Sequence, residues 1–118
     1  MAATLSKEER LSSRTAISDL MGKGRWGHHG HFKYCSLKEE GSDVNRIMVS
    51  VPKKFFKRAV GRNLLKRRIR EAYRTQKGII DGSGISLMFL YNSPEAVDYA
   101  TIRTEVADIL EYLKHPSK

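Results

Sequence analysis

The stretch from Lys53 to Lys77 constrains the fold of this chain more than any other part of the sequence. Its 25 residues hold 11 of the chain's 22 lysine and arginine residues, and Glu71 is its only acid. From Ala59 to Gln76 it contains no proline, and its one glycine, Gly61, stands near the start. The stretch therefore predicts a strongly basic helix, in which self-repulsion is costly unless a polyanion shares the charge.

The predicted helix has one apolar side and one basic side. At about 100° per residue, four apolar residues fall together, namely Leu65, Ile69, Ala72 and Tyr73. The next 140° or so of the surface is polar and holds Arg62, Asn63, Lys66, Arg67, Arg70 and Arg74. A helix face that is merely solvated normally mixes charges of both signs. The near absence of acids, and the two-bonded fork that arginine offers to phosphate, favour a nucleic-acid-binding face.

Composition supports one globular domain over residues 1–118. The chain is 40% hydrophobic and 30% charged, which is typical of a folded domain with a modest core. The net charge is +9, and the basic stretch alone contributes +10, so the basicity is local. Cys35 is the only cysteine, no apolar run is long enough to span a membrane, and the first residues lack an apolar signal core. We expect a cytoplasmic, monomeric protein.

The N-terminal half is expected to contain a helix and two strands. A helix over Thr4–Met21 is expected to begin with Ser6 as cap and Glu9 as its capping-box partner, and to end at Gly22 and Gly24. The glycine-rich run from Arg25 to His31 indicates a loop or an irregular edge. Residues 32–37 and 44–51 alternate as strands do, and we expect them to pair as a hairpin with a longer loop.

After the basic helix, one more strand and one more helix are expected. Ile85–Tyr91 is almost wholly apolar, which suits a central strand covered on both faces. A last helix should follow from a cap at Asp98 or Thr101. The resulting order is an α/β sandwich with helices against one sheet.

The sequence offers no set of residues suited to catalysis or to metal binding. No Ser/His/Asp arrangement or carboxylate pair has a spacing that would bring its members together. His28, His29 and His31 with Cys35 could in principle bind a metal, but no second ligand pair accompanies them. A loop that donates to phosphates is the favoured interpretation of these histidines, and we expect no metal site.

Phe32 and Tyr34 have two interpretations. They alternate on one strand face, which is most often a core face. The functional alternative is a platform for single-stranded nucleic acid, where stacking of a base on an aromatic ring contributes about 1–3 kcal/mol.

From Lys53 to Arg74 the sequence resembles the protein subunit of bacterial ribonuclease P. That family carries two lysines after a strand and then a helix with an Arg-Asn-Arg triplet. The matching residues here are Lys53, Lys54, Arg58, Ala59, Val60, Arg62, Asn63, Lys66, Arg67, Arg70, Glu71, Tyr73 and Arg74. Two departures stand out. Leu64 replaces the last arginine of the triplet, which could shift one RNA contact to Arg68, and aliphatic residues replace the phenylalanines that often face a cleft from the first helix.

The resemblance implies a fold and a function. The fold would be an α+β two-layer sandwich of order α-β-β(-β)-α-β-α, with a four-stranded mixed sheet and a left-handed βαβ crossover. The fourth strand would lie within residues 24–31. The protein would join a large catalytic RNA and promote removal of the 5′ leader from precursor tRNA. Mg²⁺ ions, held mainly by the RNA, would carry out the cleavage, and the protein would have no active site of its own.

The resemblance also implies two groups of site residues. The first, expected to contact the catalytic RNA in a 1:1 complex, comprises Lys53, Lys54, Arg58, Arg62, Asn63, Lys66, Arg67, Arg70 and Arg74. The second, expected to line a cleft for the single-stranded leader, comprises Phe32, Tyr34, Ile17 and Met21. A stand-alone RNA- or DNA-binding module, such as a ribosomal protein, is the alternative. The missing carboxylate cluster counts against a nuclease that acts alone.

Overall fold

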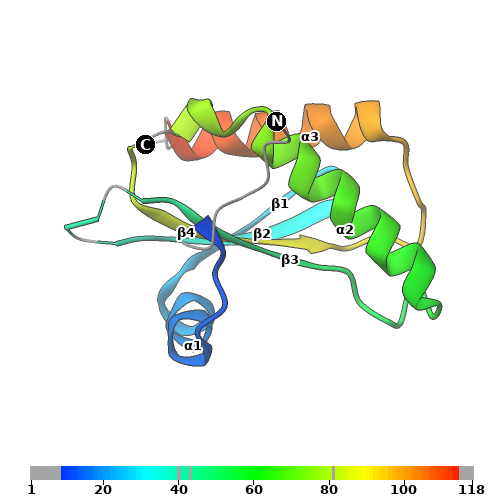
Figure 1. The fold of residues 1–118 in the computed structure, drawn as a ribbon, viewed down its shortest axis with the longest axis horizontal. Coiled ribbons are helices and arrows are strands. Elements are labelled where there is room, and N and C mark those ends of the chain that lie inside the picture. Colours follow the sequence, from blue (N-terminus) through cyan, green and yellow to red (C-terminus); the bar gives the residue numbers. More distant parts are fainter. Residues whose placement is uncertain (1–8, 40, 43, 81, 115–118) are drawn as a thin grey trace.

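A computed structural model describes residues 9–39, 41–42, 44–80 and 82–114. Its elements follow in the order α1 (Arg14–Lys23), β1 (Arg25–His29), β2 (Phe32–Lys38), β3 (Arg46–Ser50), α2 (Ala59–Arg74), the 3₁₀ turn η2 (Lys77–Ile80), β4 (Ile85–Tyr91) and α3 (Tyr99–Lys114). Figure 1 shows the four strands as one sheet, with α2 and α3 above it and α1 below. The expected α+β architecture is confirmed.

The sheet has the strand order β1-β2-β4-β3. β4 runs antiparallel to β2 and parallel to β3, so β3, α2 and β4 form a βαβ crossover. The predicted hairpin of β2 with β3 is therefore wrong, because β4 lies between them. Six of the seven residues of β4 are buried, and a strand this apolar is most stable at the centre, where both faces are covered.

β1 is the fourth strand, in the glycine-rich run where the resemblance placed it. It pairs antiparallel with β2 along its whole length, from Arg25 opposite Ser36 to His29 opposite Phe32. The turn between the two strands is made by Gly30, whose backbone adopts the left-handed conformation (φ 58°) that favours glycine.

The main core lies between the sheet and the pair α2 and α3. Alternate strand residues such as Phe32, Ile47 and Phe89 point to this side, where they meet Leu65 and Ile69 of α2. Ile102, Val106, Ile109 and Leu110 of α3 complete the same cluster. The predicted apolar side of the basic helix, α2, is thus confirmed by burial.

α1 packs on the opposite face of the sheet and begins later than expected. It starts at Arg14, and the Ser13 side chain accepts a hydrogen bond from the backbone N–H of Ala16. The expected cap Ser6 lies outside the described residues. The predicted early start of the helix is wrong for residues 9–13, which precede α1. Leu11 precedes the helix, and its N–H donates to the carbonyl of Ile47 (2.8 Å), so this segment runs along the edge of β3 instead of coiling.

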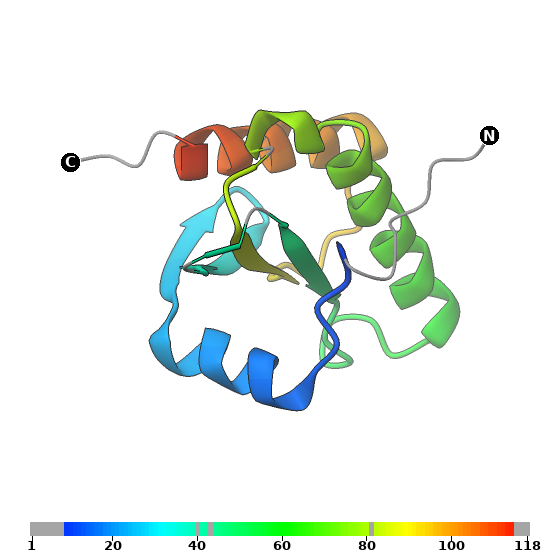
Figure 2. The ribbon, with the colours of Figure 1, turned by 60° about the vertical axis from the view of Figure 1, so that its left-hand side comes forward.

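Cover on the second face is partial. Leu20 of α1 packs with Leu11, Cys35 and Met88 in a small second cluster. Figure 2 shows α1 as the only helix on this side of the sheet within the described part of the chain. One helix is narrower than a four-stranded sheet, so part of this face is left without a helical cover.

Candidate nucleic-acid interface

The exposed side of α2 is a continuous basic surface. Leu65, Ile69, Ala72 and Tyr73 are buried against the core, which turns the predicted polar stripe outward. Asn63, Arg67 and Arg70 are exposed, and Arg62, Lys66 and Arg74 are half-buried at its margins. The packing of one side therefore fixes the direction in which the other side presents its charges.

Three arginines of α2 are engaged by the protein itself. Arg62 donates from one terminal nitrogen to the carbonyls of Phe56 (2.9 Å) and Lys57 (2.8 Å), so it holds the loop that enters the helix. Arg68 donates to the carbonyl of Val97 (3.2 Å), before α3. Arg74 forms two hydrogen bonds with the carboxylate of Glu71. The guanidinium of Arg74 holds the pKa of Glu71 below its usual value.

The remaining polar residues of the stripe are unengaged. Within the ranges that the structure describes, Asn63, Lys66, Arg67 and Arg70 have no side-chain hydrogen bond or ion pair. Uncompensated guanidinium groups in this density are costly unless an anion joins them. This unengaged set is the part of α2 best suited to bind phosphates.

A groove of about 550 Å³ runs beside α2. One wall is the helix, with Arg67, Arg70, Glu71 and Arg74, and the other is formed by residues 10–12 and by residues 47–49 of β3. Arg10 therefore adds a fourth arginine that the sequence pattern did not single out. It lies far from α2 in sequence, and only the pairing of its segment with β3 brings it there.

The loop before α2 carries further basic residues. Lys53, Lys54, Lys57 and Arg58 are all exposed. The ammonium of Lys54 lies 4.9 Å from the ring centre of Phe55, whereas Phe56 packs on the core and contacts Tyr91. The loop is thus anchored by one aromatic ring, and its charges extend the basic surface of α2.

Phe32 and Tyr34 cannot form the predicted stacking platform. They are only 1% and 8% exposed, and both point to the face covered by α2 and α3. The ring of Phe32 packs edge-on against Phe89 and Tyr91. This part of the cleft prediction is wrong, and the core interpretation of the two residues is confirmed.

The α1 side of the sheet retains the other two cleft candidates. Ile17 is half-buried against the small cluster, while Met21 is 49% exposed. The same face also carries Trp26, 43% exposed, with the ammonium of Lys33 at 5.0 Å from its ring centre. The sequence pattern did not single out Trp26, because residues 25–31 indicated a loop or an irregular edge.

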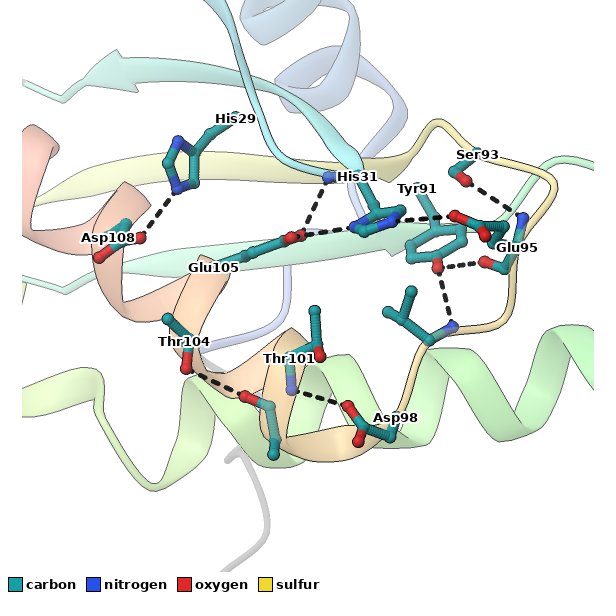
Figure 3. A network of polar contacts seen from close by, with 12 residues as sticks. His29, His31, Tyr91, Ser93, Glu95, Asp98, Thr101, Thr104, Glu105 and Asp108 are labelled. Carbon is teal, nitrogen blue, oxygen red and sulfur yellow. Dashed lines mark hydrogen bonds and ion pairs between the residues drawn. The ribbon is translucent and has the colours of Figure 1, made fainter.

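The histidines of β1 and its turn lie against α3 (Figure 3). His29 pairs with Asp108 (2.9 Å). His31 contacts Glu105 through both its ring and its backbone N–H, each at 2.9 Å, and its second ring nitrogen lies 3.4 Å from Glu95. The hydrogen bond to Glu105 raises the pKa of His31. His29 and His31 therefore contact carboxylates of the protein itself, whereas the sequence had suggested that these histidines contact phosphates.

The side chains considered for a metal site lie apart, since His29 and His31 contact acidic residues of α3 whereas Cys35 contacts α1. No three His, Cys, Asp or Glu side chains converge in the described part of the chain in a way that could hold an ion. Cys35 is fully buried and donates from its sulfur to the carbonyl of Leu20 (3.2 Å), and burial raises the pKa of its thiol.

The chain with this basic helix matches a known protein family. Residues 5–114 match the family model for ribonuclease P. This chain belongs to the ribonuclease P protein family. A ribonuclease P protein component from Porphyromonas gingivalis is 34% identical over 106 residues, which cover 83% of this chain and 77% of that relative. One from Thermotoga maritima is 28% identical and covers 97% of this chain and 99% of its own.

Solved structures of the ribonuclease P protein family share the fold. The protein from Thermotoga maritima superposes with a TM-score of 0.76 at 30% identity, covering 87% of this chain and 96% of its own. The protein from Staphylococcus aureus gives a TM-score of 0.79 at 24% identity, covering 92% and 97%. None of the helices described for this family member is long and apolar enough to cross a membrane.

Proposed function

We propose that this chain is the protein subunit of ribonuclease P and that it promotes removal of the 5′ leader from precursor tRNA. Family membership supports the subunit role. The observation that carries the proposal is the unengaged set on α2, since Asn63, Lys66, Arg67 and Arg70 face outward beside an arginine-lined groove. A phosphate backbone supplies the anions that this surface lacks.

The catalytic RNA is the proposed partner of α2 and of the loop before it. Arg67 and Arg70 offer bidentate forks to phosphates, and Asn63 and Lys66 add single contacts. Arg62 and Arg74 act mainly as positioning residues, because their guanidinium groups already hold the entry loop and Glu71. Lys53, Lys54 and Arg58 extend the same contact. We expect one protein per RNA.

The leader of precursor tRNA is the proposed ligand of the sheet face beside α1. A single strand there would lie near Ile17 and Met21, on the opposite face from the buried Phe32 and Tyr34. Such an arrangement separates the two RNAs onto different surfaces of a small protein. It also lets the protein favour a substrate with a leader over its mature product.

The chemistry of cleavage is assigned to the RNA. Phosphodiester hydrolysis by two metal ions needs both ions positioned at the scissile phosphate. No group of three His, Cys, Asp or Glu side chains among the described residues could hold a metal ion. The RNA would therefore hold the Mg²⁺ ions. The protein would raise affinity for the substrate and offset repulsion between the two RNAs.

A cleavage assay at low Mg²⁺ tests the function. Precursor tRNA is incubated with a bacterial ribonuclease P RNA, with and without this protein. The expected result is cleavage at the mature 5′ end that appears only when both are present. If the protein binds the RNA yet gives no stimulation, the subunit role fails.

That second outcome would favour the alternative, a stand-alone RNA-binding module of the ribosomal type. One observation favours this alternative, namely the tight filling of the sheet face that holds Phe32 and Tyr34. The matched test is affinity for ribosomal RNA fragments against ribonuclease P RNA at the same salt concentration. Preference for the ribosomal fragments would support the module.

A further inference from the structure

The face of the sheet that α1 only partly covers carries an exposed aromatic residue, Trp26, which is not part of the basic surface of α2. Trp26 lies on β1, opposite Cys35 of β2, and the sulfur of Cys35 points to α1. Side chains of opposed residues share a face, so Trp26 stands on the α1 side. It is nevertheless 43% exposed, because α1 covers Cys35 and Met88 and not the edge strand.

The next row of side chains on this face is open as well. It consists of His28, Lys33, Leu90 and Ser50, which follow one another across β1, β2, β4 and β3. His28 is exposed and the other three are half-buried, in contrast to Cys35 and Met88 one row away. This open row begins beside Trp26 and crosses the sheet from β1 to β3. Three strand spacings make its length about 14 Å.

The charge around Trp26 is positive. Lys33 holds its ammonium 5.0 Å from the indole centre, and the exposed Lys23 at the end of α1 lines the same hollow as Trp26. β1 and β2 contain no acid. An indole face flanked by cations is the arrangement that binds single-stranded nucleic acid, in which a base stacks on the ring and a cation meets the adjacent phosphate.

We infer that Trp26 and Lys33 form a base-stacking site for the single-stranded leader, at the edge of the sheet farthest from β3. A nucleobase stacks on the exposed indole, and Lys33 turns from the ring to the phosphate of the same nucleotide. This inference rests on the proposed function and adds residues to it. Because the site lies at the far edge, it engages only leaders long enough to cross the open row.

The test uses the fact that Trp26 is the only tryptophan of the chain. The protein is assembled with ribonuclease P RNA and titrated with precursor tRNA that carries an uncleavable scissile phosphate. We expect Trp26 emission to change in a saturable way with a leader-bearing substrate and to stay constant with mature tRNA. A leader-length series should show the change only above a minimum length. Equal emission with and without leader would overturn the inference.

Substitutions give the second readout. Trp26→Ala should weaken binding of leader-bearing substrate by about 5- to 150-fold, the usual range for one stacked base. It should leave mature tRNA unaffected, and Trp26→Tyr should restore most of the affinity. Glu111→Gln is the control, because Glu111 is exposed on α3 and does not line the hollow beside Trp26. A decrease that is equal for both RNAs would overturn the site.

Failure of the inference and failure of the proposed function can be told apart. If the protein stimulates cleavage but Trp26 emission does not respond to the leader, the stacking site alone is wrong. If the protein does not stimulate cleavage at all, the subunit role is wrong and the site falls with it.

Discussion

At the scale of single residues, the arginines of α2 divide into those that hold the protein together and those that are free. Arg62, Arg68 and Arg74 have partners within the chain, whereas Arg67 and Arg70 have none in its described part. All five look alike in the sequence. Only the structure distinguishes them, because their partners are backbone carbonyls and Glu71, brought close by packing.

The free arginines should control the salt dependence of RNA binding. Arg67→Ala or Arg70→Ala is expected to weaken binding to ribonuclease P RNA and to reduce the slope of log K against log salt by about 1 for each phosphate that is no longer neutralised. Filter binding across a salt series measures this. Arg68→Ala is the control, with little change in slope, because its guanidinium is turned to Val97. An unchanged slope in both test variants would refute the assignment.

Leu64 offers a gain-of-function test. It is 42% exposed at the place where the family's triplet has its last arginine. Leu64→Arg should cost no core packing and should let the helix neutralise one more phosphate, which raises the salt slope by about 0.7–0.9. The same binding series measures it, with Leu64→Gln as the uncharged control. Equal slopes for the arginine and glutamine variants would show that position 64 faces no phosphate.

At the scale of elements, the sequence predicted best where one residue pattern determines the outcome. α2 and β4 follow directly from an uninterrupted helical period and an apolar run. β1 was harder to predict because its glycine and histidines have no strand pattern, and its order comes from pairing with β2. The start of α1 was misplaced because Leu11 serves the edge of β3 instead. The remaining error concerned the leader-cleft role of Phe32 and Tyr34. Their alternation in the sequence places both on one face of the sheet, but it does not show whether that face is buried or open.

The contact between the β1–β2 turn and α3 should depend on pH. His31 has its pKa raised, chiefly by the hydrogen bond to Glu105. The folded state therefore favours the imidazolium, and this stabilisation is full below the unfolded pKa of 6.5 and is lost as pH rises through the raised folded value. His31→Gln should accordingly lower the free energy of unfolding more at pH 6 than at pH 9. Urea titrations at both values measure it, and the opposite trend would contradict the ion pair.

Asn45 should be important for the junction of β3, η2 and β4. Its buried amide donates to the carbonyl of Ile80 (2.7 Å) and accepts from the N–H of Ile85 (2.9 Å). Asn45→Ala would leave both groups without a partner and should lower the free energy of unfolding by about 1–3 kcal/mol. Urea denaturation measures this decrease. The exposed Asn92, substituted in the same way, should change it by less than about 0.5 kcal/mol.

At the scale of the whole molecule, charge is segregated. The basic loop and α2 stand on one side, while Glu95, Glu105 and Asp108 gather near the β1–β2 turn (Figure 3). The chain carries a net charge of +9, but this charge is unevenly distributed. The electrostatic potential that attracts RNA is therefore strongest on the side of the basic loop and α2. Association with ribonuclease P RNA should be fast at low salt and should slow steeply as salt rises. Stopped-flow mixing measures this rate, and a salt-independent rate would argue against steering.

The short backbone pairing of Leu11 with Ile47 has a consequence for solubility. β3 is an outer strand, and an outer strand with open amides invites another chain to add to the sheet. The segment that forms one wall of the arginine groove thus also shields the sheet from self-association. A groove that opened widely enough to release this segment would uncover the edge. Docking of residues 10–12 along β3 should therefore limit aggregation, and it also shapes the groove where we expect RNA to bind.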